Sequence, residues 1–353
     1  MPIIQADALR AFITDIFEAT GAPRAEAAIV GEHLVEANLM GHDSHGIVRT
    51  LGYVNQTKTG ALVPAAPVEV SGGRGGAAVV DVHWNFGQVG ATRAMEVAIE
   101  RAREFGLGAA VCRNCGHIGR VGAYGELAAA AGMIGMACVN NPGTEGLVAP
   151  FGGAKGRMGT NPWSVVIPTT DPTRPFVLDF ATSVAAEGKV RVARNKGLEM
   201  PPDYLIDSAG RPTRNPADLY LNEAGERGAL LPFGGPVGYK AYGLAMAVEA
   251  LSGALSGSGT AGSGKLGGNG VFMLAMDVSA FIDRGEFDGS FSGLVEHVTQ
   301  PPYREGYEEI LTAGEPERRR MAQRLADGID VDEETWRQVC EAASVVGVEA
   351  LEV

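Results

Sequence analysis

Apolar residues recur at helical spacing in two segments near the beginning of the chain. The spacing predicts amphipathic helices over residues 5–19 and 24–40. The segment GHDSHG (41–46) ends the second helix, and the apolar positions from Ile47 to Tyr53 begin a further element. Pro64 and Pro67 then form a linker. The pattern therefore predicts a helical N-terminal part over residues 1–75.

Beyond this part, short apolar runs alternate with helix-like segments, which is typical of an α/β core. Strands are expected over residues 77–82, 107–112, 133–139, 165–168, 176–179 and 271–276. Helices are expected over residues 88–105, 121–131, 184–195 and 239–255, and towards the C-terminal end over 316–326 and 333–346. The chain thus divides into a helical part (1–75), an α/β core (76–315) and C-terminal helices (316–353).

Two segments of the core are suited to line a binding site. Residues 140–161 are rich in Gly, Pro and Asn, and a loop of this length inside a compact domain is usually functional. The segment LDFATS (178–183) precedes the predicted helix 184–195, so Asp179 and the Thr-Ser pair stand where N-cap residues belong. Capping is the plain interpretation of Asp179, although the free N–H groups of a helix start also suit a phosphate.

Composition narrows the classes of protein to which the chain can belong. With 353 residues and 45% hydrophobic side chains it can bury a large core, and its net charge of −13 disfavours nucleic acid and anionic membranes as partners. An anionic substrate would therefore need positively charged side chains at its binding site. We expect no signal peptide, because the first residues lack a basic region, and no membrane span, because the apolar stretch 127–139 is too short.

The cysteines and the glycine-rich motifs indicate neither a disulfide framework nor a nucleotide-binding loop. Cys112 and Cys115 form a C-x-x-C pair without a second pair for zinc, and four cysteines in a chain of this length suit the reducing cytoplasm. A match to G-x-G-x-x-G at residues 257–262 follows a predicted helix rather than a strand, which excludes the Rossmann fingerprint. His42 and His45 lack a carboxylate-rich partner motif, so we expect no metal.

We expect the chemistry in the stretch VCRNCGHIGRVGAYG (111–125). His117 stands between two glycines, after a predicted strand and before a predicted helix. Ligands of α/β sheets gather at the carboxyl ends of strands, so this position suits a reactive imidazole. A single His between glycines can equally be a plain turn residue.

Two further polar clusters accompany His117 in the sequence, namely His45 with Arg49, and Asp179 with the Thr-Ser pair that follows it. Two imidazoles, a guanidinium and a carboxylate are the groups needed to reduce a 2-oxo acid. The guanidinium can hold the substrate carboxylate, a His can protonate the carbonyl oxygen, and an Asp can orient that His and raise its pKa. Sequence alone does not show that these groups meet.

Taken together, the motifs resemble the malate/L-lactate dehydrogenase family. The matching segments span nearly the whole chain and are GHDSHG (41–46), GHIGR (116–120), APFGG (149–153), GTNP (159–162), LDFATS (178–183), GYKAYGLAMAVEALSGALSG (238–257) and DGIDVDEETW (327–336). The resemblance implies an α/β fold with a mixed-sheet, non-Rossmann NAD(P)-binding core and helical N- and C-terminal parts, the C-terminal helices packing on the N-terminal part.

The resemblance also implies roles for particular residues. His117 or His45 would be the proton donor, and we prefer His117 for its place after a strand; Arg49 would bind the substrate carboxylate. From the residue types themselves, we expect Asp179 to orient the His. The cofactor, NAD or NADP, is expected to contact His45, Arg120, Asp179, Phe180, Ala181, Thr182, Lys240, Gly314 and Glu315.

We therefore hypothesise an NAD(P)H-dependent oxidoreductase that interconverts a 2-oxo acid and a 2-hydroxy acid by hydride transfer. The resemblance implies a homodimer with the active site near the partner subunit. Reduction of a cyclic imine acid is an alternative, because an imine needs the same hydride and the same grip on a carboxylate. A non-catalytic cofactor-binding protein is a weaker alternative. The particular substrate, and the choice between NAD and NADP, stay open.

Overall fold

A seven-stranded mixed sheet forms the centre of the molecule. The computed structural model describes residues 2–142, 146–195, 197–265 and 267–352. In sheet order the strands are β2 (Glu69–Ser71), β3 (Ala77–Asp81), β4 (Leu107–Cys115), β11 (Asn269–Asp277), β5 (Met133–Asn140), β6 (Trp163–Ile167) and β7 (Phe176–Phe180). β3 and β4 run parallel and the other neighbours antiparallel. The predicted mixed-sheet α/β core is therefore confirmed.

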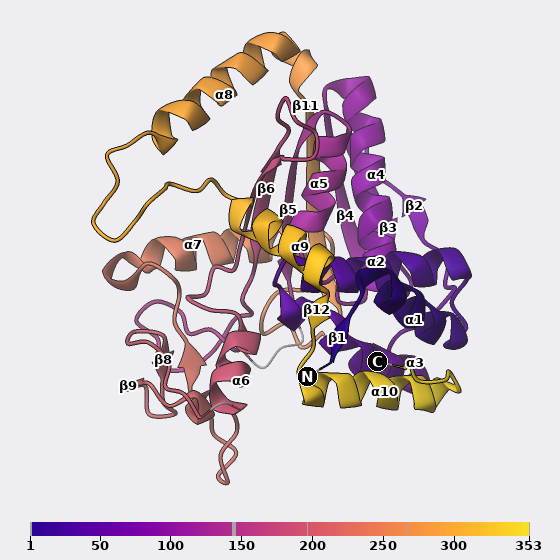
Figure 1. Ribbon diagram of the computed structural model, residues 1–353, viewed down its shortest axis with the longest axis vertical. Helices are drawn as coiled ribbons and strands as arrows, with labels where there is room; N and C mark the ends of the chain where they lie inside the picture. Colours follow the sequence, from indigo (N-terminus) through magenta and orange to yellow (C-terminus); the bar gives the residue numbers. More distant parts are fainter. Residues whose placement is uncertain (1, 143–145, 196, 266, 353) are drawn as a thin grey trace.

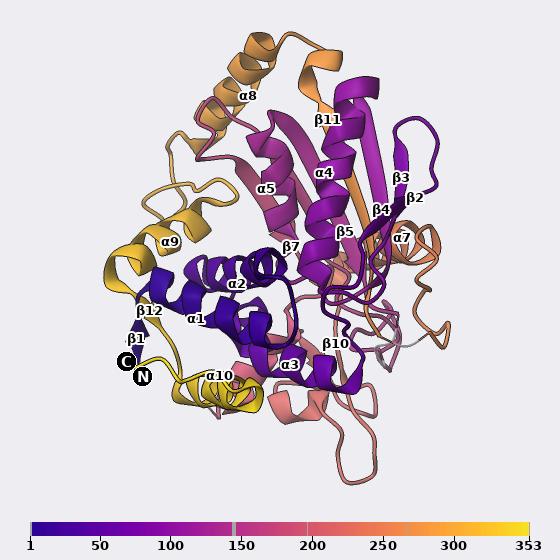
Figure 2. The same ribbon diagram turned by 90° about the vertical axis from the view of Figure 1, so that its right-hand side faces the viewer.

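Helices cover both faces of this sheet (Figures 1 and 2). α4 (Gly87–Phe105) and α5 (Gly122–Ala130) pack on one face, where alanines and glycines allow a close approach to β4 and β5. α7 (Tyr239–Val248) and its π-helical continuation Glu249–Ala254 contact β5 and β11 on the other face. The residues between β4 and α5 thus lie at one end of the sheet, beside the N-terminal helices.

The two ends of the chain meet in a second hydrophobic core. α1 (Ala6–Ala19), α2 (Arg24–Leu39), α3 (Thr50–Thr59) and α10 (Glu333–Val346) share it, and α9 (Glu315–Asp327) contacts α2. A short ladder joins β1 (Ile3–Ile4) to β12 (Ile329–Asp330). Figure 1 shows both termini side by side at this end of the molecule.

The helix predicted over 184–195 begins later than expected. α6 spans Glu187–Asn195, because the preceding residues use their N–H groups on other segments. Thr182 N–H donates to the carbonyl of Thr160, and Val184 N–H donates to that of Leu231. α6 packs beside a small sheet made of β8 (Leu205–Ile206), β9 (Pro212–Thr213) and β10 (Ala229–Leu230).

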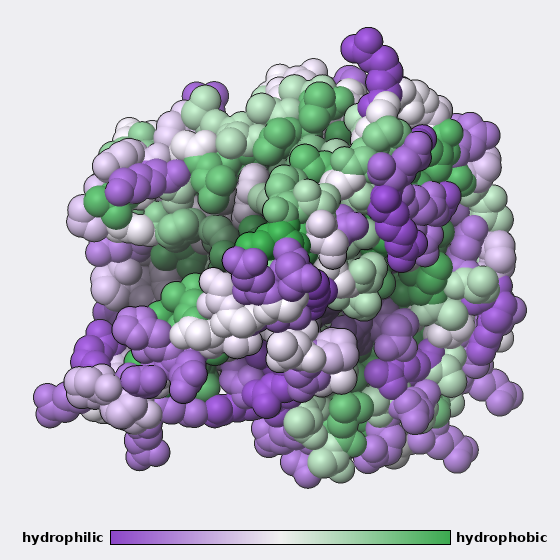
Figure 3. Space-filling view, turned by 90° about the horizontal axis from the view of Figure 1, so that it is seen from above, coloured by the Kyte–Doolittle hydropathy of each residue, from purple (hydrophilic) through white to green (hydrophobic). Residues whose placement is uncertain are grey.

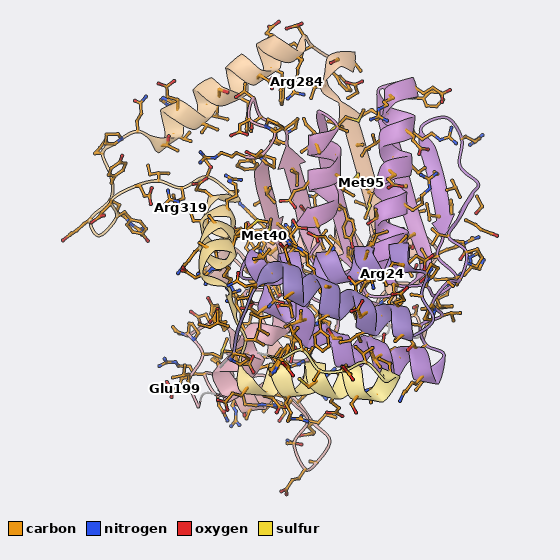
Figure 4. The ribbon with its side chains drawn as sticks, turned by 45° about the vertical axis from the view of Figure 1, so that its right-hand side comes forward. Arg24, Met40, Met95, Glu199, Arg284 and Arg319 are labelled. Atoms are coloured by element: carbon orange, nitrogen blue, oxygen red, sulfur yellow. The ribbon has the colours of Figure 1, made fainter. Side chains whose placement is uncertain are left out.

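One long helix was not predicted. α8 (Arg284–Thr299) contains three glycines and has no buried residue, so no core imposes a clear apolar period on its sequence. It stands apart from the body of the molecule in Figure 1. Arg284 ties its first turn to the carbonyls of Gly132 and Thr169, and Figure 4 labels this residue. Among the described residues, no helix is both long enough and apolar enough to cross a membrane.

Candidate active site

His117 lies in the loop that joins β4 to α5, at the end of a central strand, as the sequence predicted. The loop depends on a glycine two residues later. Gly119 has a φ of 74°, and a Cβ at this position would lie 2.3 Å from Nε2 of His33. His33 is buried on α2, and its Nε2 accepts a hydrogen bond of 2.9 Å from the N–H of Arg120. The N-terminal helices therefore shape the loop that carries His117.

The two candidate imidazoles meet. The rings of His45 and His117 stack with centroids 5.8 Å apart and an interplanar angle of 11°. Ser44 Oγ lies 3.1 Å from Nδ1 of His45, and Tyr53 OH lies 2.6 Å from Nδ1 of His117. Residues 43–53 thus bring one imidazole, and the partner of the other, from the N-terminal helical part to the end of the sheet.

Arg49 joins this cluster. Its Nε donates a hydrogen bond of 2.6 Å to the carbonyl of Ser44, while its outer nitrogens are engaged by no group that the described chain supplies. Burial lowers the pKa of His45 to about 3 and lowers that of His117 well below 6.5, and the charge of Arg49 adds to both effects. Both imidazoles are therefore neutral at neutral pH, beside a guanidinium with free donors.

Asp179 has a different partner from the one expected. It lies in β7, and its carboxylate accepts a hydrogen bond of 2.7 Å from the N–H of Gly122 in the first turn of α5. It therefore caps α5, whereas the sequence suggested a cap for the helix after it. Burial raises its pKa, and the charge of Arg120 opposes that rise. Within the described residues, Nδ1 of His117 contacts Tyr53 OH and the N–H of Gly119, whereas the Asp179 carboxylate bonds to Gly122.

Arg120 is buried between two carboxylates. Its guanidinium pairs with Glu126 and, at 3.3 Å, with Glu36, and its side chain is only 3% exposed. Burial raises the pKa of Glu36, although Arg120 opposes this effect. The charge of Arg120 is thus largely compensated within the protein, although the residue still lines the cavity described next.

A cavity of about 740 Å³ lies beside His45. Its wall combines residues of the 41–45 segment, the loop after His117, the end of β7 and the start of α6. The wall residues that were predicted to bind the cofactor are His45, Arg120, Asp179, Phe180 and Ala181. A smaller cavity of about 90 Å³ adjoins it at His42 and Asp179, and is lined by Gly314 and by Met40, which lies at the end of α2 beside α9 (Figure 4).

Three predicted cofactor contacts lie elsewhere. Thr182 is buried, and its hydroxyl donates to the carbonyl of Thr160. Glu315 is held by Arg174, Arg318 and Arg319, whose hydrogen bonds outweigh desolvation and lower its pKa to about 2. Lys240 is exposed on α7, outside the described lining of both cavities. Within one chain, these three residues do not face the cavity beside His45.

Sequence reasoning missed Tyr53 and Gln88. Tyr53 follows Arg49 by four residues, so both project from the same side of the helical segment, which is a signal that the sequence does contain. Gln88, in the first turn of α4, donates a hydrogen bond of 3.2 Å to Tyr53 OH. This hydrogen bond joins the first turn of α4 to α3 across 35 positions of the chain, and the sequence carries no signal for it. No three His, Cys, Asp or Glu side chains of the described residues are grouped to hold a metal.

Comparisons with known proteins show which relatives the chain resembles. Hydroxycarboxylate dehydrogenase B of Escherichia coli K12, whose motifs the chain resembles, is 37% identical over 97% of this chain and 94% of the relative. Malate dehydrogenase of Pyrococcus abyssi is 35% identical over 99% of this chain and 96% of its own length. The crystal structure of malate dehydrogenase from Entamoeba histolytica superposes with a TM-score of 0.92 at 28% identity, covering 98% of both chains.

A solved Δ1-piperideine-2-carboxylate reductase from Pseudomonas syringae is a more distant match, with a TM-score of 0.81 and 25% identity over 97% of this chain and all of that one. The family model described as malate/L-lactate dehydrogenase matches residues 4–340. This chain therefore belongs to the malate/L-lactate dehydrogenase family.

Proposed function

We propose that the protein is an NAD(P)H-dependent oxidoreductase that interconverts a 2-oxo acid and a 2-hydroxy acid. The observation that carries this proposal is Arg49, a guanidinium with free outer nitrogens beside two neutral imidazoles. Such a guanidinium can hold a carboxylate through two parallel hydrogen bonds. An imidazole beside such a guanidinium could then give a proton to the neighbouring carbonyl oxygen of a 2-oxo acid. The dehydrogenase relatives act on acids of this kind, as their names state.

The large cavity suits a dinucleotide. Its volume of about 740 Å³ falls within the roughly 300–1,000 Å³ typical of ligand sites. When bound, a dihydronicotinamide would supply the hydride. Ala181 and Ser183 would contact the cofactor along the β7 end of the cavity, and Lys189 would offer a cation to its phosphates. Asp179, Glu317 and Lys189 line the cavity together, so the residues present give no clear preference between NAD and NADP.

Each remaining step belongs to a side chain of this protein. Arg49 would orient the substrate by its carboxylate, so that the carbonyl oxygen faces an imidazole. His117 would donate the proton, with His45 stacked against it as the alternative donor. His117 is preferred because two hydrogen bonds hold its ring, from Tyr53 OH and from the N–H of Gly119. A fixed ring keeps the donor aligned with the oxygen.

We further propose that the protein forms a homodimer, and α8 supports this. The helix has no buried residue, although Leu294 is 52% exposed and Val298 47% exposed. Tyr307 and Ile310 add exposed apolar surface in the segment that follows. Figure 3 looks down on this end of the molecule and shows hydrophobic surface over a broad part of it. Contiguous apolar surface of this kind is typical of protein–protein interfaces.

The test is turnover of a panel of acids with NADH and with NADPH, followed by the loss of dihydronicotinamide absorbance. The panel contains pyruvate, oxaloacetate, 2-oxoglutarate, phenylpyruvate, sulfopyruvate and a cyclic imine acid. Turnover of a 2-oxo acid is the expected result. Turnover of the imine acid alone would favour the second candidate, for which the solved piperideine-carboxylate reductase provides the reason. Cofactor binding without any turnover would support a non-catalytic protein and refute the proposal.

A further inference from the structure

We propose that Tyr53 passes a proton to Nδ1 of His117 while Nε2 of His117 protonates the substrate oxygen, a step that rests on the proposed reductase function. Tyr53 OH lies 2.6 Å from Nδ1, and the two residues are 64 positions apart in the chain. Tyr53 would thus be a positioning residue and a proton relay, acting on the substrate only through His117.

The direction of the hydrogen bonds follows from a backbone amide. The N–H of Gly119 points at Nδ1 of His117 at 3.3 Å, and a backbone N–H can only donate. Nδ1 must therefore carry the lone pair, and the single proton of the neutral ring must lie on Nε2. Tyr53 OH, which contacts the same Nδ1, then has to donate its own proton to this atom.

The other hydrogen-bond partner of Tyr53 agrees with this direction. The amide Nε2 of Gln88 donates to the hydroxyl oxygen at 3.2 Å, which leaves the hydroxyl proton free to point at His117. Tyr53 itself is only 4% exposed, so no bulk water competes for that proton. Gln88, Tyr53 and His117 thus form a chain in which every donor points towards the imidazole.

This series of hydrogen bonds explains how a neutral imidazole can act as an acid without becoming an anion. Burial first, and Arg49 second, lower the pKa of His117, so the ring has only the Nε2 proton to give. Losing that proton alone would leave an imidazolate anion in a buried site. If the O–H bond of Tyr53 breaks as an N–H bond forms at Nδ1, the ring stays neutral in its other tautomer.

The proton and charge balance is then complete. The carbonyl carbon gains a hydride from the dihydronicotinamide and the carbonyl oxygen gains the Nε2 proton, which forms the hydroxy acid. The negative charge rests on the oxygen of Tyr53, where the Gln88 amide donates to it and the charge of Arg49 favours it. After release, water reprotonates Nε2 of the partly exposed His117, and the Nδ1 proton returns to Tyr53. Burial raises the pKa of Tyr53 to about 12, which keeps its proton in place at rest.

The decisive experiment compares Tyr53→Phe with Tyr124→Phe. Tyr124 is the matched control, because it is equally buried and its hydroxyl donates to the carbonyl of Ile118, next to His117. Single-turnover reduction rates are measured in mixtures of H₂O and D₂O. The wild type and Tyr124→Phe should show a curved dependence on the deuterium fraction, because two protons move together. Tyr53→Phe should show a linear dependence and a rate about 100-fold lower, within the usual range for lost proton transfer.

Two results of this comparison would overturn the relay. A linear dependence in the wild type would mean that one proton moves. A slower Tyr53→Phe enzyme that keeps the curved dependence would mean that Tyr53 only supports the loop.

A further measurement separates the relay from the proposed function. ¹⁵N NMR of the ligand-free protein should find the proton of His117 on Nε2, and a proton on Nδ1 would refute the relay alone. Absence of turnover with every 2-oxo acid would instead refute the reductase function.

Discussion

Replacing Arg49 tests the carboxylate grip more directly than any other change. In Arg49→Met the side chain keeps much of its length and loses its charge and all its donors. Two outer nitrogens are free for the substrate, and a hydrogen bond to a charged group contributes about 1.5–3 kcal/mol. Arg49 is partly exposed, so we take the lower value for each bond and expect a loss of about 3 kcal/mol. This corresponds to a fall in kcat/KM of about 100-fold.

The assay compares a 2-oxo acid with its ethyl ester as substrates. The ester keeps the carbonyl group and loses the anionic carboxylate. In Arg49→Met, kcat/KM should therefore fall about 100-fold for the acid and stay almost unchanged for the ester. Arg49→Lys is the matched control. It keeps the positive charge beside both imidazoles but cannot form the bidentate pair, and it should lose roughly tenfold with the acid.

The same substitution should also change the pKa values of the two imidazoles. The charge of Arg49 helps to lower the pKa of His45 and of His117, so both pKa values should rise in Arg49→Met and stay low in Arg49→Lys. An NMR titration of the two rings measures this directly. If Arg49→Met reduced the acid within about threefold of the wild-type rate, the free guanidinium would not be the carboxylate site, and the reasoning from its unused donors would be wrong.

Three further predictions concern stability and assembly. Gly119→Ala should lower the free energy of unfolding in urea by about 2 kcal/mol or more, since a φ of 74° and a Cβ 2.3 Å from His33 Nε2 both oppose it; an unchanged midpoint would refute the close packing. Burial, aided by Arg120, lowers the pKa of His33 from 6.5 to about 3, so between these pH values the unfolded chain binds a proton that the folded chain does not. Stability should therefore fall as the pH drops through this window, and less steeply in His33→Gln, while parallel curves would show that another group is responsible. Leu294→Asp on α8 should halve the mass seen in sedimentation, whereas Leu198→Asp, at a comparably exposed site, should not; a dimer that survives the first change would exclude the α8 face.

Local sequence predicted most of the elements that hold the site. Periods of 3.6 and 2 residues reflect which side of an element meets the core, and α1, α4, α10 and β6 each have one clear core face. His117 was expected after a strand because a glycine-flanked polar loop between strand and helix is visible within one short segment. α8 was missed for the same reason, because it has no core face within its own chain.

The contacts of the site were decided by the tertiary structure. Tyr53 reaches His117, Asp179 reaches the N–H of Gly122, and His33 reaches that of Arg120, each across more than fifty residues of chain. β11 enters between β4 and β5 although its first residue, Asn269, lies 129 positions beyond Asn140 at the end of β5. A periodic pattern states which face of an element is buried, but not which other element covers it.

The sequence by itself therefore determined the kinds of groups available, namely two imidazoles, a guanidinium and a carboxylate, and the strand and helix ends that carry them. Only the tertiary structure decided that Asp179 caps α5, that Arg120 is neutralised by two carboxylates, and that Tyr53 holds the imidazole. The physical reason is that hydrogen bonds and ion pairs act over about 3 Å, so their partners are chosen by the packing of whole helices and strands. Residue spacing along the chain does not encode that packing.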